Sequence, residues 1–257
     1  MSQPVANRLW ALEPATYLPL NAPVGTARAD VARLPLPVFL IDHPGGLVLF
    51  DAGLDPDGAD NPESTYGPLA RKIDIDFRRE HLIENQVRDI GHRTADIEHV
   101  VASHLHFDHI GGLREITHAR VYVGDGELDY ARSPEKFCAS WYRPKDFEAD
   151  LDWFVVAADF DVFGDGAIRL LTLPGHSPGS LGLLVRLPER VIVITGDAVH
   201  TRAAYESEAA YVGDVDTVTA RRSLRKLRFV AETEHADVWI NHDPDDWERF
   251  GGAGAKC

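Results

Sequence analysis

The chain has 257 residues, of which 44% are hydrophobic and 26% charged, a composition typical of a globular protein that buries its core without disulfides. Forty-one acidic residues against 26 basic ones give a formal net charge of −15, which argues against nucleic acid or an anionic membrane as a partner. The two cysteines, Cys138 and Cys257, provide no disulfide framework and no thiolate metal site, so we expect a reducing compartment, the cytoplasm. The N-terminus lacks the basic and apolar regions of a signal peptide, and no apolar run approaches the ~20 residues of a membrane span.

The first half of the chain alternates short apolar runs with turn and helix signals. PVFLID (37–42) and LVLFDAG (47–53) flank a His-Pro-Gly-Gly turn, which predicts a β-hairpin. Residues 54–68 are rich in Gly, Pro, Asp and Asn and predict a loop. Residues 80–91 place aliphatic side chains near one face and end at a glycine, which predicts a helix with its stop. Two further strands are expected at HVVAS (99–103) and RVYVG (120–124).

The second half returns to strands after an irregular aromatic stretch. Residues 132–160 predict either a poorly periodic helix pair or a cap over a site, and core packing explains each aromatic ring taken alone. Residues 214–233 predict a helix with Asp214 or Asp216 as its cap. The buried face of that helix is expected at Val218, Leu224, Leu227 and Ala231. Strands are expected at AIRLLTLP (167–174), SLGLLVRL (180–187), VIVIT (191–195) and DVWIN (237–241).

This order of elements predicts an α/β fold in one domain over residues 1–257, with two sheets packed face to face and covered outside by helices. Polar clusters follow four of the strands, the first within SHLHFDHIGG (103–112). Strand ends at one edge of a layered α/β protein face a common rim where ligands tend to bind. The rim therefore gathers seven side chains that can bind metal: His104, His106, Asp108, His109, His176, Asp197 and His242.

Seven nitrogen and oxygen ligands are too many for one tetrahedral ion and suit two ions that share a bridging carboxylate. Zn, Mn, Fe and Co all accept this donor set. In an extended segment side chains alternate, so His104, His106 and Asp108 can point one way while His109 turns elsewhere. A bend at the following glycines can then aim Asp108 and His109 at a second ion.

The motifs HLHFDH with GG following, PGHSPGS, TGDA and a late His after an apolar strand resemble the metallo-β-lactamase superfamily. The resemblance implies a four-layer αββα sandwich with a dinuclear site. It places His104, His106 and His176 on the first metal, Asp108, His109 and His242 on the second, and Asp197 between them. Asp51 matches the family's strand-end Asp, in a supporting role. Within the superfamily, LPVFLIDHPGGLVLFDAGLDP and HDPDDW look like the N-acyl-homoserine lactone lactonases.

One position departs from that pattern. The lactonases commonly carry a tyrosine three residues after the bridging Asp, where it is thought to contact the substrate carbonyl, and this chain has His200 there. An imidazole can donate a hydrogen bond to a developing oxyanion as a phenol can, so His200 is a candidate catalytic residue. Tyr205 and Tyr211 follow closely and are alternative sources of a phenol, although ordinary half-buried tyrosines explain both.

The resemblance implies a metal-dependent hydrolase that opens the ring of a neutral lactone, most naturally an N-acyl-homoserine lactone, in quorum quenching. The expected attack is by a hydroxide that bridges two divalent ions, most naturally zinc, with Asp108 moving a proton to the leaving group. An acyl tail would need an apolar groove, which residues 137–160 or 17–38 are expected to line. A lactonase for another lactone, a glyoxalase II-like thioesterase and a non-catalytic metal-binding module stay open, as does a homodimer.

Overall fold

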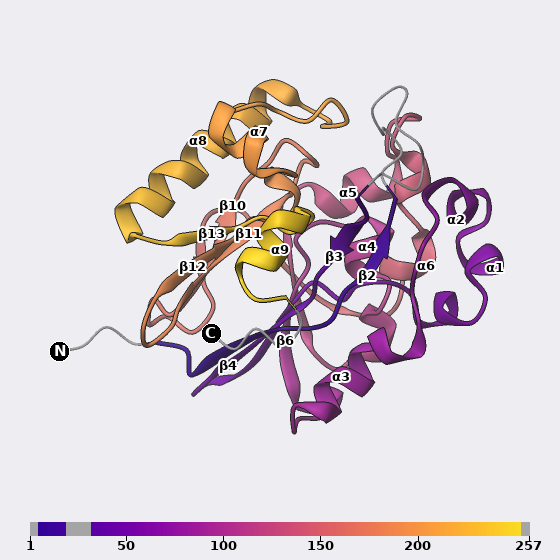
Figure 1. The fold of residues 1–257 in the computed structure, drawn as a ribbon, viewed down its shortest axis with the longest axis horizontal. Helices are drawn as coiled ribbons and strands as arrows, with labels where there is room; N and C mark the ends of the chain where they lie inside the picture. Colours follow the sequence, from indigo (N-terminus) through magenta and orange to yellow (C-terminus); the bar gives the residue numbers. More distant parts are fainter. Residues whose placement is uncertain (1–4, 19–31, 253–257) are drawn as a thin grey trace.

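The computed structural model describes residues 5–18 and 32–252, and within these ranges the chain forms two main β-sheets flanked by helices (Figure 1). The first sheet has six strands in the order β1-β4-β5-β6-β7-β8. Its first three strands are antiparallel and the remaining pairs are parallel. The strands are β1 (Arg8–Ala11), β4 (Phe39–His43), β5 (Gly46–Phe50), β6 (Ile97–Val101), β7 (Arg120–Gly124) and β8 (Asp152–Val156).

The second sheet comes from the second half of the chain and has five strands in the order β13-β12-β11-β10-β9. Its pairs are antiparallel except for the parallel pair of β12 and β13. A separate two-stranded ribbon joins β2 (Ala15–Tyr17) to β3 (Leu34–Leu36). The strands of the second sheet are β9 (Phe160–Asp161), β10 (Ile168–Thr172), β11 (Leu181–Arg186), β12 (Val191–Ile194) and β13 (Asp237–Trp239).

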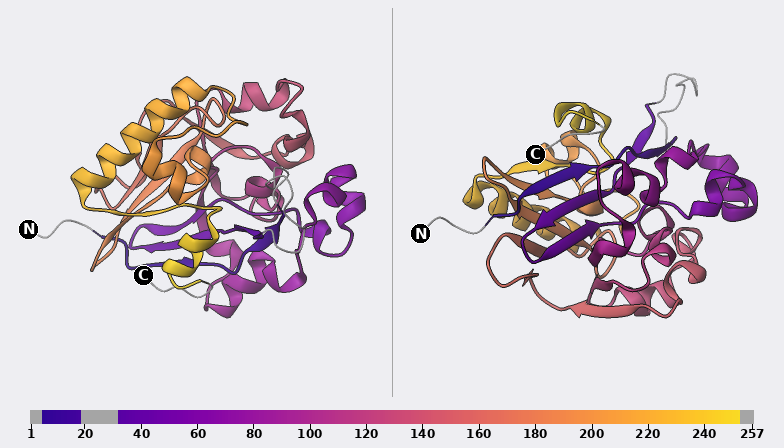
Figure 2. Two further views of the ribbon diagram at one scale, coloured as in Figure 1. Left: turned by 45° about the horizontal axis from the view of Figure 1, so that its top comes forward. Right: turned by 90° about the horizontal axis from the view of Figure 1, so that it is seen from below.

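Helices cover the outer faces of both sheets (Figure 2). The longest is α8 (Thr217–Glu234), which lies over the second sheet, and the shorter α3 (Ile83–Asp89) packs on the first. The other α-helices are α1 (Pro62–Tyr66), α2 (Pro68–Ile73), α4 (Phe107–Ile110), α5 (Glu127–Arg132), α6 (Pro144–Phe147), α7 (Arg202–Ser207) and α9 (Pro244–Arg249). Short 3-10 turns lie at η2 (Pro56–Ala59), η3 (Arg79–His81), η4 (Thr94–Asp96), η5 (Leu113–Glu115), η6 (Ala139–Trp141) and η7 (Gly196–Ala198).

Three apolar layers hold this arrangement together. The middle layer lies between the sheets, where Phe39 and Phe50 of the first sheet meet Trp239 of the second. One outer layer packs α3 and the aromatic segment against the first sheet, and the other packs α8 against the second. Because β5 is covered on both faces, its sequence GLVLF is a continuous apolar run rather than an alternating one. The expected four-layer αββα sandwich is therefore confirmed.

Several local predictions need correction. Residues 54–68 are not a loop but hold η2 and α1, because Asp55 caps the first turn and a proline occupies the first turn of each. The helix expected at 80–91 begins only at Ile83, after a separate 3-10 turn. Residues 132–160 are neither a helix pair nor a simple cap, since they include strand β8, and Phe147 is part of the core.

The helix expected at 214–233 forms as α8 and is capped by Asp216 rather than Asp214. The Asp216 carboxylate accepts hydrogen bonds from the backbone N–H groups of Val218 and Thr219 at 2.9 and 3.0 Å. Leu224, Leu227 and Ala231 are buried as expected, but Val218, in the first turn of the helix, is 56% exposed. In the described part of the chain, no helix is long and apolar enough to cross a membrane.

Candidate metal centre

The seven side chains expected at the rim come together between the two sheets, and all are buried. Three subsets have donor atoms within 4.8 Å of one another. We call His104, His106 and His176 the first group, and Asp108, His109 and His242 the second group. The remaining subset, His104, His109 and Asp197, joins the two groups.

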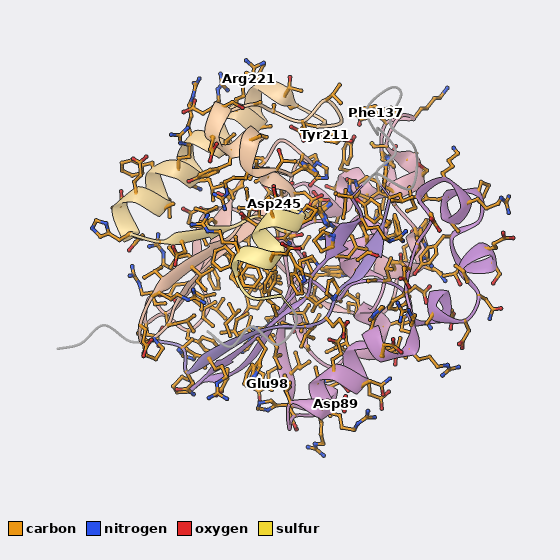
Figure 3. The ribbon with its side chains drawn as sticks, viewed as in Figure 1. Asp89, Glu98, Phe137, Tyr211, Arg221 and Asp245 are labelled. Atoms are coloured by element: carbon orange, nitrogen blue, oxygen red, sulfur yellow. The ribbon has the colours of Figure 1, made fainter. Side chains whose placement is uncertain are left out.

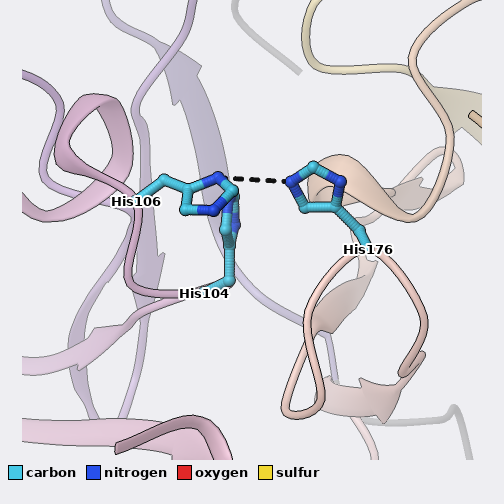
Figure 4. Close-up of side chains that lie close together, drawn as sticks. All are labelled: His104, His106 and His176. Carbon is cyan, nitrogen blue, oxygen red and sulfur yellow. Dashed lines mark hydrogen bonds between the residues drawn. The ribbon is translucent and has the colours of Figure 1, made fainter. Parts of the chain in front are cut away.

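The first group joins loops from opposite sheets. His104 and His106 follow β6, and His176 follows β10 (Figure 4). Nδ1 of His106 lies 3.3 Å from Nε2 of His176. Two nitrogens that bind the same tetrahedral zinc ion, each at ~2.0–2.1 Å, lie about 3.3 Å apart. The spacing of the first group therefore fits one shared ion.

The second group is built on a turn of helix rather than on an extended segment. His106 precedes α4, and Asp108 and His109 belong to α4 itself, so the expected strand-like alternation is wrong from Phe107 onward. The helical turn, rather than alternation, brings Asp108 and His109 together with His242. Nε2 of His109 lies 3.2 Å from Nε2 of His242, which again is the spacing of two donors to one ion.

Asp197 lies between the two groups with one oxygen toward each. Its Oδ2 is 3.4 Å from Nε2 of His176, on the side of the first group. Its Oδ1 is 3.4 Å from Nε2 of His109 and 3.0 Å from Nε2 of His242, on the side of the second group. A carboxylate that faces two histidine clusters with separate oxygens has the geometry of a bridging ligand.

Polar atoms that lack protein partners mark where the ions fit. Among the described residues, His104 Nε2 and Asp108 Oδ1 are buried without a hydrogen-bond partner. Buried polar atoms are normally satisfied, so two such atoms within the ligand set fit cations held there. The residues present therefore suit metal ions.

Three of the histidines have a hydrogen-bond acceptor at Nδ1, the ring nitrogen that faces away from the proposed metal. Asp51 Oδ2 accepts a hydrogen bond from Nδ1 of His109 at 2.8 Å, and the backbone carbonyl of Pro35 accepts one from Nδ1 of His242 at 2.7 Å. Asp214 Oδ1 lies 3.2 Å from Nδ1 of His176. Each acceptor fixes the proton on Nδ1 and leaves Nε2 free for a metal. Asp51 thus has the supporting position expected for it.

Asp51 reaches this position through an uncommon backbone conformation. Its φ is +62°, in the left-handed region that few residues other than glycine adopt. The turn at the end of β5 brings both carboxylate oxygens onto Ser103, which donates from its backbone N–H at 2.7 Å and from its hydroxyl at 3.0 Å. Asp51 therefore braces the beginning of the His104 loop as well as His109.

The electrostatics separate the two groups. Burial lowers the pKa of His104 and His106, so both are neutral and ready to bind a cation. Burial also opposes protonation of His109, but the nearby carboxylates of Asp197, Asp51 and Asp108 outweigh it and raise the pKa of His109 to about 10. A divalent ion must therefore displace a proton from the second group. Burial disfavours the charged form of Asp197, yet His242, His109 and His200 hold its pKa well below the ordinary value.

The wall around the first group is aromatic. His200 places Nε2 3.2 Å from Asp197 Oδ2, and its ring lies 4.5 Å from that of Tyr211. Trp141 and Tyr142 pack against His106 with ring centroids at 5.9 and 4.6 Å. The exposed side chains of Phe137 and Tyr211 lie on the upper side of Figure 3, whereas Asp89 and Glu98 lie on the lower side.

The two tyrosines considered as substitutes for the family's phenol differ in position. Tyr205 contacts the guanidinium groups of Arg202 and Arg228 with its ring, away from the histidines. Tyr211 lies beside His200, and its backbone N–H donates to Asp214 at 2.8 Å. Of the two, only Tyr211 is placed to reach the site.

Comparison with known proteins agrees with this geometry. Residues 33–249 match the family model described as the metallo-beta-lactamase superfamily. The chain belongs to the metallo-β-lactamase superfamily. It is 35% identical over 224 residues to the N-acyl homoserine lactonase AttM of Rhizobium radiobacter, which covers 85% of each chain. The predicted resemblance to the N-acyl-homoserine lactone lactonases is thereby confirmed.

Two solved structures show the same fold. A Bacillus thuringiensis AiiA variant with N-decanoyl-L-homoserine bound at its active site superposes with a TM-score of 0.83 at 23% identity, covering 95% of this chain and 96% of that one. AidC, described as a dizinc quorum-quenching lactonase, superposes with a TM-score of 0.65 at 17% identity, covering 95% and 92%.

Sequence reasoning missed three supporting groups: the Pro35 carbonyl, Asp214 as a partner of His176, and the buried Glu127. A backbone carbonyl carries no sequence signal. The sequence predicts Asp214 only as a candidate helix cap, but Asp216 caps α8 and Asp214 instead lies beside Nδ1 of His176. An acidic residue immediately after an apolar strand and a glycine turn was the one signal for Glu127.

Proposed function

We propose that this protein hydrolyses the lactone ring of N-acyl-homoserine lactones with a dinuclear metal site. The observation that carries the proposal is the position of Asp197, whose two oxygens face two separate histidine clusters. The relative AttM of Rhizobium radiobacter supports the substrate, because it is named an N-acyl homoserine lactonase and is 35% identical to this chain over 85% of each.

Two divalent ions are proposed as the cofactors. The first group would hold one ion and the second group the other, with Asp197 available to both. Zinc is the proposed metal because the donors are imidazole and carboxylate and because AidC, of the same fold, is a dizinc enzyme. Fe, Mn and Co accept the same donors.

Two divalent ions held by these groups would lower the pKa of coordinated water toward ~7 and so would supply a nucleophile at neutral pH. The protein's own part begins with exclusion of bulk water, since all seven proposed ligands are at most 7% exposed. Asp108 lies on α4 with Oδ1 free of hydrogen bonds, and it is proposed to carry the proton to the leaving alkoxide.

His200 is proposed to donate to the carbonyl oxygen of the lactone. Its Nε2 is the nitrogen turned toward the ligands, 3.2 Å from Asp197 Oδ2. Its Nδ1 is buried without a partner. A neutral imidazole has only one N–H group. To donate to the substrate, the Nε2–H group of His200 must therefore give up its contact with Asp197 when that carboxylate binds metal.

The acyl tail is proposed to lie along the aromatic wall. Trp141 is half-buried and packs against His106 with ring centroids 5.9 Å apart, so an apolar chain on Trp141 would stay close to the reacting ring. Part of the other stretch considered for this role, residues 19–31, lies outside the described residues. A neutral lactone with an apolar tail also suits a surface of formal charge −15, which does not repel it.

We further propose that the chain acts as one hydrolase domain in the cytoplasm. Cys138 is buried and unpaired, as expected of a protein kept under reducing conditions. Sedimentation of the purified protein tests whether it forms a homodimer.

The deciding experiment measures the turnover of γ-lactones with acyl tails of different lengths alongside thioesters, with metal analysis of the same sample. Lactone opening by a sample that holds two ions per chain is the expected result. Thioester cleavage without lactone opening would instead assign the chain to glyoxalase II-like thioesterases. At most one ion, with no hydrolysis of any ester, would make it a non-catalytic metal-binding protein.

A further inference from the structure

Glu127 is a buried carboxylate outside the proposed ligand set. It begins α5, directly after the turn that ends β7, and is 0% exposed. Its two oxygens reach different loops. Oε1 accepts a hydrogen bond from the backbone N–H of Leu105 at 3.0 Å, and Oε2 accepts one from the backbone N–H of Gly179 at 2.8 Å.

These two loops carry the whole first group. Leu105 lies between His104 and His106, and Gly179 lies three residues after His176. Figure 4 shows the imidazoles of His106 and His176 approaching each other from opposite loops. Glu127 therefore spans the gap that an ion of the first group must also span.

Burial of this carboxylate needs a reason. Burial raises the pKa of Glu127, and hydrogen bonds from Ser177 and from the backbone of Leu105 and Gly179 oppose that change. A buried carboxylate is costly unless hydrogen bonds satisfy it, and a neutral residue would avoid the cost. An acid at this buried position therefore favours a role that needs two acceptor oxygens at once.

The backbone segments around Glu127 are closely packed. A Cβ at Gly124 would lie 1.9 Å from the carbonyl oxygen of Gly179, and a Cβ at Gly179 would lie 2.5 Å from Cβ of Glu127. The His176 loop therefore lies directly on the turn between β7 and α5. The backbone N–H of Leu181 donates to the carbonyl of Ser103 at 2.7 Å and so joins the same two loops at their base. Further along the loops, Glu127 makes the connection between Leu105 and Gly179.

We propose that Glu127 is a positioning residue for the first metal ion, because it fixes the separation of the loops that present His104, His106 and His176. This inference rests on the proposed dinuclear function. Glu127 makes its backbone hydrogen bonds to the two loops of the first group, so its effect should fall mainly on the first of the two ions.

The test uses the variant Glu127→Gln, whose amide offers one acceptor oxygen and turns an N–H₂ toward the other loop. In the metal-free protein, we expect faster hydrogen exchange at the amide of Leu105 or Gly179. In zinc titrations against a chelator, we expect the first ion to bind at least about 10-fold more weakly and the second ion to change less than about 3-fold. His106→Ala and His242→Ala identify which dissociation constant belongs to which group.

Leu227→Ala is the matched control, because it opens a cavity under α8 and destabilises the fold without removing a contact of Glu127. Glu127→Asp is the second variant, since a side chain one methylene shorter keeps the charge but cannot span both loops. Unchanged affinity for the first ion in both Glu127 variants would overturn the inference. So would equal weakening of both ions, matching Leu227→Ala. Failure of the wild-type protein to bind two ions would instead refute the proposed function.

Discussion

The two sheets contribute to the site in different ways. The first sheet supplies four of the seven proposed ligands from one short stretch after β6. The second supplies His176, Asp197 and His242, one each after β10, β12 and β13. Each candidate ion therefore takes donors from both sheets, and the site joins them across their interface. A single residue of the second sheet should then matter as much as the dense motif of the first.

The largest effect is expected from Asp197→Asn. An amide cannot bind two cations with two anionic oxygens, so both ions should bind more weakly and kcat/KM should fall more than about 100-fold. Metal analysis of the purified variant, together with lactone hydrolysis, measures both effects. Asp165→Asn is the control, because it removes a carboxylate paired with His43 outside the site. Full retention of both ions in Asp197→Asn would show that the second sheet supplies no bridge.

The difference between the sheets also explains what the sequence could predict. The HxHxDH spacing is local, so the first sheet's ligands were visible as a motif. His176, Asp197 and His242 were predicted from their place after apolar strands, because strand ends gather at one rim whatever their separation in sequence. The two-sheet architecture followed from the same alternation of apolar runs.

Other features depend on tertiary contacts that no local pattern encodes. Strand β8 was missed because its residues, DWFVV, are half exposed and lie at the edge of the sheet, where no regular alternation develops. Val218 fits the helical period but lies on the exposed first turn. The hydrogen bonds that the Pro35 carbonyl accepts from His242 and that Asp214 accepts from His176 form only after the ribbon and the loop before α8 have packed.

His200→Phe is expected to have the second largest effect, on the side of the second sheet. Loss of a donor to the developing oxyanion should lower kcat about 100-fold, with the content of both ions unchanged. Steady-state kinetics and metal analysis of the same preparation test this. His118→Phe, at an exposed histidine outside the site, provides the matched control. A loss of metal in His200→Phe would show that His200 braces Asp197 instead of contacting substrate.

Asp51→Asn tests the support that the first sheet gives to the second group. Asparagine tolerates the left-handed backbone of this position as aspartate does, so the turn should be kept. The neutral side chain polarises Nδ1–H of His109 less, and the ion of the second group should bind about 10-fold more weakly. Chelator competition measures this change. A larger loss at the first group would mean that the Asp51 bonds to Ser103, rather than to His109, are decisive.

Asp216→Ala should have the smallest effect on catalysis. It tests whether the stability of α8, in the second half of the chain, affects kcat/KM. The variant loses the cap of α8, which should lower the free energy of unfolding by about 1 kcal/mol in urea titrations. The start of α8 is also joined to the His176 loop, but by backbone bonds, from Asp216 N–H to the Gly175 carbonyl and from Val215 N–H to that of His176. These bonds survive the substitution, so kcat/KM should change less than about 2-fold, in line with other surface substitutions. A fall of 10-fold would show that the second sheet holds His176 through the helix cap, whereas the first sheet holds its ligands through a buried carboxylate.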